Sequence, residues 1–244
     1  MVLYMIGIGL QDEKDISVKG LEAVKKCSKV YLEGYTSLLS VGVDELSKFY
    51  GKKIIVAGRD MAEQGMEKIV QEAKSDDVAF LVIGDVFSAT THISMMIEAR
   101  RRKVPVEVVH NASVLTAVGV TGLELYKFGK VTSIPFDNDN VEEPVKVLEM
   151  NMKNRLHTLF LLDLKPDENK FMTSAEAAEY LISKGADAGL RAVACAKLGS
   201  KEQVIKVRKL GEMINIKIAK FPQCLIVPAK NLHFVEEEAL EAWR

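Results

Sequence analysis

Short apolar runs rich in β-branched residues alternate, along the first half of the chain, with longer stretches in which apolar residues recur at helical spacing. In one such stretch, Met66, Ile69, Val70 and Ala73 follow the i, i+3, i+4, i+7 pattern of one helix face. The pattern predicts strands at 2–8, 30–32, 54–56, 78–83 and 106–109, and helices at 18–26, 43–50, 61–73, 92–102 and 114–122. Ser17 can serve as the N-cap of the first of these helices. This alternation is typical of βα units around a parallel sheet buried on both faces.

The second half has a different pattern. It predicts strands at 131–134, 158–164, 191–197, 204–207 and 224–227, and helices at 141–152, 175–184 and 235–242. A short turn, Gly199-Ser200-Lys201, separates two of these strands, which indicates a hairpin and therefore a mixed sheet. We therefore expect an α/β fold of two lobes, an N-terminal domain over residues 1–128 and a C-terminal domain over residues 129–244.

Composition narrows the class of protein. The 33 basic and 34 acidic residues almost cancel, whereas nonspecific nucleic-acid binding needs clustered positive charge, so no direct nucleic-acid partner is expected. The three cysteines share no CxxC spacing, which fits a reducing compartment. The apolar N-terminus has no basic segment and turns acidic at Asp12, so it does not resemble a signal peptide. Since no apolar run approaches the roughly 20 residues of a membrane span, we expect a cytoplasmic protein with no membrane partner.

The first candidate for a binding loop is Gly7-Ile8-Gly9, where the first strand meets the first helix. A dinucleotide fingerprint would need a third glycine at position 12, and Asp12 stands there, so a nicotinamide-dependent oxidoreductase is disfavoured. Two interpretations stay open. The glycines form a purely structural tight turn, or they let the backbone approach a ligand at the carboxyl end of the strand.

Gly84-Asp85, at the end of the most apolar strand, is the best functional candidate. Small hydroxyl residues such as Ser88 follow it, and ligands in open α/β sheets bind outside the carboxyl ends of strands. The other interpretation makes Asp85 an ordinary loop residue and a nearby hydroxyl a helix N-cap. His110 and Ser113 repeat the pattern after the next strand, where Ser113 can likewise cap a helix.

Other side chains give little sign of catalytic chemistry. His157 and His233 flank apolar strands, where a lone histidine is usually structural. No two histidines and a carboxylate lie at helical ligand spacing, so no metal site is expected. No Ser-His-Asp or Cys-His arrangement can be recognised. This pattern suits a reaction in which the cosubstrate itself carries the activated group.

A set of motifs spread over nearly the whole chain resembles the diphthine synthases, and the combination is specific. The motifs are MVLYMIGIGL (1–10), DE (12–13), ISVKGL (16–21), YTSL (35–38), GD (84–85), ATTH (89–92), His110, SV (113–114), AVG (117–119), TGL (121–123), YKFGK (126–130), HTL (157–159), IVP (226–228) and His233.

This resemblance implies a tetrapyrrole-methylase-like fold with S-adenosylmethionine held in a cleft between two lobes, usually in a homodimer, and S-adenosylhomocysteine as product. It implies that Asp85 faces the ribose. The implied cosubstrate contacts are Leu10, Asp85, Ser88, Ser113, Val114, Leu164, Leu210 and His233. The implied acceptor is the amino group of 2-(3-amino-3-carboxypropyl)histidine on translation elongation factor 2, in the pathway of diphthamide synthesis.

The chemistry of that acceptor leads us to expect no dedicated base and no metal, and the catalytic residues stay unassigned. The amine resembles an α-amino group with a pKa of about 8, so part of it is neutral near pH 7. Two rival functions stay open besides the oxidoreductase. One is methylation of a corrin or another tetrapyrrole precursor, and the other is a noncatalytic module that binds S-adenosylmethionine.

Overall fold

The protein is described by a computed structural model over residues 1–35, 37–58 and 65–244. Thr36, and the first four residues of the helix expected at 61–73, lie outside the described residues. The chain divides into two compact units, Met1–Leu115 and Thr116–Arg244, and each is described on its own. No described helix combines the length and the apolar character that a membrane crossing requires.

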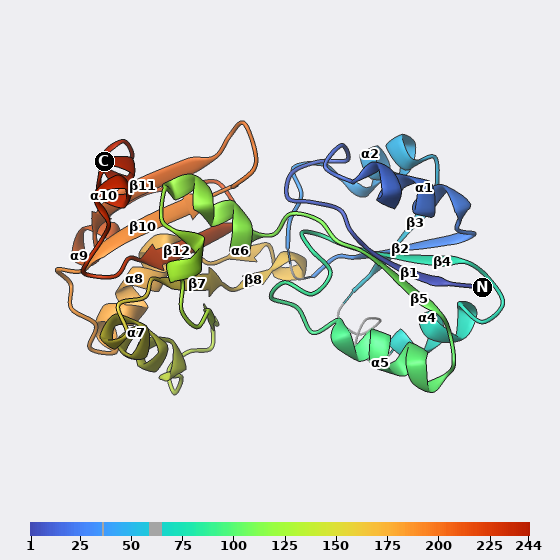
Figure 1. Ribbon diagram of the computed structural model, residues 1–244, viewed down its shortest axis with the longest axis horizontal. Helices are drawn as coiled ribbons and strands as arrows, with labels where there is room; N and C mark the ends of the chain where they lie inside the picture. Colours follow the sequence, from blue (N-terminus) through green and yellow to red (C-terminus); the bar gives the residue numbers. More distant parts are fainter. Residues whose placement is uncertain (36, 59–64) are drawn as a thin grey trace. The chain divides into compact units, whose positions relative to one another are not determined.

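A five-stranded parallel sheet forms the centre of the first unit (Figure 1). Its strands run in the spatial order β3-β2-β4-β1-β5. Their bounds are β1 Leu3–Gly7, β2 Lys29–Glu33, β3 Ile54–Ala57, β4 Val78–Val82 and β5 Val106–Val109. Every residue of β4 is buried, as expected for a strand covered on both faces. The parallel sheet predicted from the alternating pattern is confirmed.

Helices cover both faces of this sheet. Figure 1 shows α1 and α2 on one face and α4 and α5 on the other. Alternate residues of β1 face the two layers of helices. Met5 packs in the core beneath α4 and α5, while Ile6 packs beneath α1 and α2. Ser17 caps α1 by accepting a bond from the Gly20 N–H, as predicted. The helices are α1 Val18–Lys26, α2 Val43–Tyr50, α4 Met66–Glu72, α5 Ile93–Arg101 and the short α6 Val114–Ala117.

The second unit is built on a mixed five-stranded sheet in the order β11-β10-β12-β7-β6. Only β6 and β7 pair in parallel, and β10 and β11 form the predicted hairpin. The strands are β6 Thr132–Ile134, β7 Thr158–Leu162, β10 Arg191–Ala196, β11 Val204–Lys209 and β12 Gln223–Val227, with a small β8–β9 hairpin at Leu164–Lys165 and Lys170–Phe171. The mixed sheet inferred from the sequence is confirmed.

Helices α7 Glu143–Lys153 and α8 Ser174–Ser183 pack with the short α9 Leu210–Met213 on one face of this sheet. Thr173 and Glu176 form a capping box at the start of α8. The pattern of apolar residues did not predict α9, which has only four residues and so gives no helical period. The last helix is α10 Phe234–Glu241, and three short 3₁₀ turns are η1 Val118–Thr121, η2 Leu125–Lys127 and η3 Pro166–Glu168.

The boundary between the units lies earlier than the expected join after residue 128. Residues after Leu115 group with the second unit because they bond to it. Glu124 donates its N–H to Glu236, and the segment at Lys127 and Gly129 pairs with His157 on both sides. The helix expected over 114–122 is also shorter, because α6 gives way to η1 after four residues.

Candidate functional site

The loops that follow β1 and β4 are joined by two backbone hydrogen bonds. The Gly9 N–H donates to the Gly84 carbonyl over 3.3 Å, and the Gly84 N–H donates to the Gly9 carbonyl over 2.7 Å. Asn111, after β5, reaches the same place, because its side-chain amide donates to the Gly7 carbonyl over 2.9 Å. The loops at the carboxyl ends of three neighbouring strands therefore form one connected structure.

Packing between these loops explains the glycines of the first motif. A Cβ atom on Gly7 would lie 2.7 Å from the Gly84 carbonyl oxygen. Gly9 has φ +82°, and a Cβ atom there would lie 2.3 Å from Cβ of Asp15. The Asp15 carboxylate holds the turn by accepting bonds from the N–H groups of Leu10 and Gln11. The structural interpretation of these glycines is thus sufficient in itself, and it leaves the ligand interpretation open.

The Asp85 carboxylate lies at the centre of the hydrogen bonds that join the loops after β4 and β5. Its Oδ1 accepts bonds from the Phe87 N–H and the Ser88 hydroxyl, both over 3.1 Å, and its Oδ2 accepts one from the Asn111 N–H over 3.1 Å. Nδ1 of His110 lies 2.8 Å from Oδ2. Burial by itself would raise the pKa of Asp85, but the bonds from Asn111, His110, Phe87 and Ser88 outweigh burial and lower it. Since a carboxylate has about four acceptor positions, all of them are used.

The imidazole of His110 contacts the Asp85 carboxylate and is exposed to solvent. Its side chain is 69 % exposed, whereas that of Asp85 is 9 % exposed. The ring also lies edge-on to Phe87, with centroids 6.2 Å apart. Because an ionised carboxylate only accepts, Nδ1 must carry the hydrogen of the bond, and Nε2 is the nitrogen left for another partner. The exposed imidazole is therefore held in one orientation by a buried carboxylate.

The other expected contacts in the first unit lie on the same three loops. Leu10, Ser88 and Val114 are half-buried, while Ser113 is buried and accepts a bond from the Leu115 N–H. At Gly84 (φ +84°) a Cβ atom would approach nothing closer than the Ala112 carbonyl at 3.8 Å and the Leu10 side chain at 3.9 Å. These are ordinary contact distances, so the positive φ, and not a lack of room, favours glycine at this position.

The three expected contacts in the second unit are not brought together. Leu164 follows the carboxyl end of β7, next to the start of β12, whereas Leu210 follows β11 at the opposite end of the same sheet. A strand of this length spans about 17–20 Å. The Leu210 side chain is fully buried and its N–H donates to Leu190. His233 caps α10, also at the Leu210 end.

A second histidine–carboxylate pair, His157 and Glu236, is fully buried in this unit. Nε2 of His157 lies 2.9 Å from Glu236, and its Nδ1 accepts the Ala229 N–H over 3.0 Å, so the ring is neutral with the hydrogen on Nε2. Burial lowers the pKa of His157. Glu236 also accepts bonds from Lys127, Glu124 N–H and His233 N–H. Burial opposes ionisation of Glu236, but these bonds lower its pKa to about 2.

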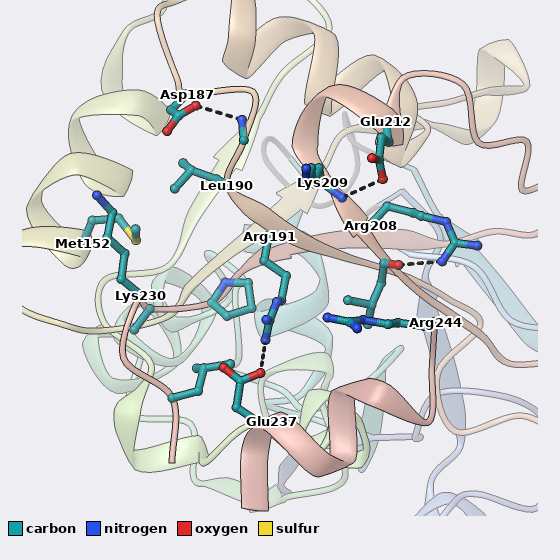
Figure 2. Close-up of a pocket in the computed structure, with 15 residues that line it drawn as sticks. Met152, Asp187, Leu190, Arg191, Arg208, Lys209, Glu212, Lys230, Glu237 and Arg244 are labelled. Atoms are coloured by element: carbon teal, nitrogen blue, oxygen red, sulfur yellow. Dashed lines mark hydrogen bonds and ion pairs between the residues drawn. The ribbon is translucent and has the colours of Figure 1, made fainter. Parts of the chain in front are cut away.

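The second unit also contains a cavity of about 550 Å³, at the end of the sheet where β10 begins and β11 ends (Figure 2). Arg191 pairs with Glu237 across it, and Arg208 donates to the Val207 carbonyl. Five basic and three acidic side chains line it, so its wall favours an anion over a cation. The cavity adjoins Leu210 and lies at the opposite end of the sheet from Leu164.

The sequence named His110 as part of a second binding-loop pattern but assigned no role to Asn111, and it did not show that these residues contact loops 25 and 104 residues away along the chain. His92, at the end of the ATTH motif, is 2 % exposed and packs against Phe80 in the core. Within the described ranges, no three His, Cys, Asp or Glu side chains gather as metal ligands. Cys195 and Cys224 lie opposite each other on paired strands, both buried and free.

The sequence and fold were then compared with known proteins. The family described as Tetrapyrrole (Corrin/Porphyrin) Methylases matches residues 2–214. Diphthine methyl ester synthase of Dictyostelium discoideum is 38 % identical and aligns with 100 % of this chain and 98 % of its own length. The enzyme of the same name from Saccharomyces cerevisiae is 40 % identical over 98 % of this chain and 88 % of its own. The human enzyme is 39 % identical, with 98 % and 94 % covered.

Solved structures give the same result. A crystal structure of diphthine synthase superimposes with a TM-score of 0.94 at 40 % identity, over 100 % of this chain and 96 % of that one. The putative diphthine synthase from Entamoeba histolytica gives a TM-score of 0.91 at 37 % identity, over 99 % and 98 %. The two-lobed architecture is therefore that of solved proteins over its full length.

Proposed function

Because the chain belongs to the tetrapyrrole methylase family and, within it, to the diphthine synthases, we propose that it methylates translation elongation factor 2 in diphthamide synthesis. S-adenosylmethionine is the methyl donor. The acceptor is the amino group of 2-(3-amino-3-carboxypropyl)histidine, which is methylated repeatedly. The observation that carries the proposal is the meeting of the loops after β1, β4 and β5 around Asp85 at one sheet edge, in a chain similar over its whole length to diphthine synthases.

The first unit offers a suitable site for the donor. We propose contacts at Leu10, Asp85, Ser88, Ser113 and Val114, which lie on these loops. Backbone N–H and C=O groups of these loops can orient the donor. Since all acceptor positions of Asp85 are used, a ribose hydroxyl would take the place of the Ser88 hydroxyl, whose 3.1 Å contact is longer than the 2.8 Å contact of His110.

When bound, the donor supplies an activated methyl group on a sulfonium. The residues of this chain then need to hold the acceptor nitrogen in line with that methyl, with the reacting atoms roughly 3–3.5 Å apart. A water-poor site also disfavours the charged form of the acceptor amine, which lowers its pKa. Positioning and the neutral state of the amine are therefore the two tasks that remain for the protein.

A second product is favoured by the names of the relatives, which are called diphthine methyl ester synthases. We propose that the same site also esterifies the carboxylate of the acceptor after the amine is fully methylated. A carboxylate is already a nucleophile at neutral pH, so it needs only the same alignment with the methyl group.

The deciding experiment is methyl transfer from labelled S-adenosylmethionine to elongation factor 2 that carries the unmethylated adduct, read by intact mass. Gains in steps of one methyl would support the activity and count the additions. A further methyl that mild alkali removes would identify the ester. If S-adenosylmethionine binds tightly but no mass is gained, the acceptor is wrong, and tetrapyrrole precursors become the next acceptors to try.

The role of Asp85 is tested by calorimetry with S-adenosylmethionine. Asp85→Ala should weaken binding by roughly 10- to 100-fold, since it removes a charged acceptor and releases two loops. Glu107→Ala, which removes an exposed carboxylate on β5 of the same unit, is the matched control and should leave the affinity unchanged. Equal affinity for Asp85→Ala and the parent chain would remove Asp85 from the donor site.

In the second unit, Leu164 and the pair Leu210 and His233 are alternative contacts, since they occupy opposite ends of the sheet. Leu164→Ala and His233→Ala, compared in the same calorimetric assay, decide which end meets the donor. We further propose a cytoplasmic homodimer, which light scattering of the purified chain and imaging of a tagged chain would test.

A further inference from the structure

The geometry points to His110 as the general base of amine methylation and to Asp85 as the residue that orients it. This inference rests on the proposed function and deepens it, because it assigns the proton transfer that repeated methylation requires. The sequence led us to expect no dedicated base. The structure changes that expectation by placing an exposed imidazole on a buried carboxylate at the edge proposed for the donor.

The hydrogen bond fixes which nitrogen is available. Asp85 accepts from the Asn111 and Phe87 N–H groups and from the Ser88 hydroxyl, so it is held as an anion that cannot donate. Nδ1 of His110 therefore carries the hydrogen in the 2.8 Å contact, and the lone pair of the neutral ring is on Nε2. A base held by a third group in this way has the geometry of catalytic dyads on unrelated folds.

The position of the ring supports a part in the reaction. His110 lies between β5 and Ser113, on one of the loops proposed to contact the donor, and its ring is open to solvent. The charged groups on the adjoining loops are Asp85, in direct contact with it, and Asp12, Glu13, Lys14 and Asp15 after β1. Oδ2 of Asp15 is bound by the Leu10 and Gln11 N–H groups, and Lys14 pairs with Glu13. If a donor ribose binds Asp85, the Ser88 hydroxyl is the partner that it replaces, and the Asp85–His110 contact is kept.

The proton balance shows why a base is useful. The acceptor starts each round as an ammonium, and one proton passes from its nitrogen to Nε2 of His110. The nitrogen lone pair then forms the N–C bond while the C–S bond breaks, and that electron pair stays on sulfur in S-adenosylhomocysteine. His110 returns its proton to water. Each round of N-methylation releases one proton in this way, whereas esterification of a carboxylate releases none.

The magnitude of the effect follows from the acceptor. The acceptor amine stands next to its own carboxylate, which raises its pKa above the value of about 8 of a peptide α-amino group, so less than about a tenth of it is neutral at pH 7. A base can recover at most this deficit, so its advantage is largest at pH 7 and shrinks as the pH rises and more of the amine becomes neutral. A variant that damaged the loop without affecting proton transfer would lose the same factor at every pH.

The test is single-turnover methyl transfer by His110→Gln between pH 6.5 and 9, with saturating donor and intact mass as readout. We expect N-methylation several-fold slower than in the parent chain at pH 7, a gap that narrows steadily toward pH 9, and an unchanged rate for any ester formed. The affinity of His110→Gln for the donor, measured by calorimetry, should stay within twofold of the parent chain.

Two further variants test the same role. Asp85→Asn should show the same pH-dependent loss of N-methylation rate, and added imidazole should partly restore the N-methylation rate of His110→Ala. Arg100→Gln, an exposed change on α5 of the same unit, is the control for lost charge.

The outcomes separate the two proposals. Wild-type transfer at pH 9, where more of the amine is already neutral, supports the proposed function whatever His110 does. If His110→Gln then equals the wild type at every pH, or loses an equal factor at every pH, the base is overturned. No transfer by the wild type at pH 9 overturns both proposals. Nitrogen NMR of the histidine-labelled protein adds a readout without turnover, since a hydrogen found on Nε2 of neutral His110 would contradict the assigned orientation.

Discussion

The two units each contain a histidine bonded to a carboxylate, and the two pairs differ in what surrounds the second ring nitrogen. In the first unit, His110 is 69 % exposed and its Nε2 is left for an external partner. In the second, His157 and Glu236 are both fully buried, and the second nitrogen of His157 is taken by the Ala229 N–H. The same chemical pair is open to solvent in one place and closed in the other.

The difference shows that a histidine–carboxylate contact does not by itself indicate catalysis. The buried pair ties α10 and the 124–129 segment to the start of β7, with every polar atom of its side chains bonded. Such a network stabilises one arrangement of the chain. The exposed pair joins two loops, and its remaining nitrogen makes no hydrogen bond to the part of the chain that the structure describes.

The largest effect is expected for His157→Ala. It leaves Glu236 with an unpaired acceptor and Ala229 with an unpaired donor in the interior, which should cost roughly 3–5 kcal/mol of unfolding free energy. Trp243, the single tryptophan, lies in the second unit, so its fluorescence during urea unfolding reports this loss. The matched change His110→Ala should cost less than about 1 kcal/mol. Equal losses of unfolding free energy in the two variants would show that the two pairs contribute equally to stability, against this prediction.

Acid should destabilise the second unit through the same network. The pKa of Glu236 is lowered to about 2 from an ordinary value of 4.5, so its contribution is complete above pH 4.5 and is lost as the pH falls toward 2. The loss should reach about 3 kcal/mol. His157, whose pKa is also lowered, acts in the same direction once the pH falls below 6.5. Glu236→Gln should flatten the acid dependence of the Trp243 transition, and an unchanged curve would place the titrating group elsewhere.

A smaller effect should distinguish the binding loops from an ordinary turn. Gly9→Ala and Gly185→Ala both place a side chain at positive φ, +82° and +97°, which costs about 1–2 kcal/mol. Only Gly9 also meets Asp15, at 2.3 Å, so its variant should lose about 2–3 kcal/mol and bind S-adenosylmethionine more weakly. Thermal unfolding and calorimetry measure both effects. If the two variants lose the same stability and bind S-adenosylmethionine equally well, the packing of Gly9 against Asp15 is not needed for donor binding.

The smallest effect is expected from chelation. The methyl donor is already activated, and the proposed proton transfer needs only His110, so EDTA should leave the rate of methyl transfer unchanged. A loss that one particular added metal restores would show that a metal ion takes part in the reaction and would revise the roles of both pairs.

The sequence by itself determined the features that depend on neighbouring residues. The Ser17 cap, the helix at 43–50 and the hairpin at Gly199 depend on spacing within a few positions, and the structure confirms them. The run of motifs also indicated the family. The helix expected over 114–122 was wrong in length, because η1 replaces its second half.

Only the tertiary structure decided which loops meet. Asp85 contacts His110 from 25 residues away, and His157 contacts Glu236 from 79 residues away. Strand register placed Leu164 and Leu210 at opposite ends of one sheet, although both seemed equally suited to one ligand. The orientation of a side chain across such distances is set by strand pairing and by competition for each donor and acceptor. Those long-range contacts leave no local pattern in the chain, so only the structure shows that His110 is exposed with one ring nitrogen left for a partner, while His157 is buried with both ring nitrogens bonded.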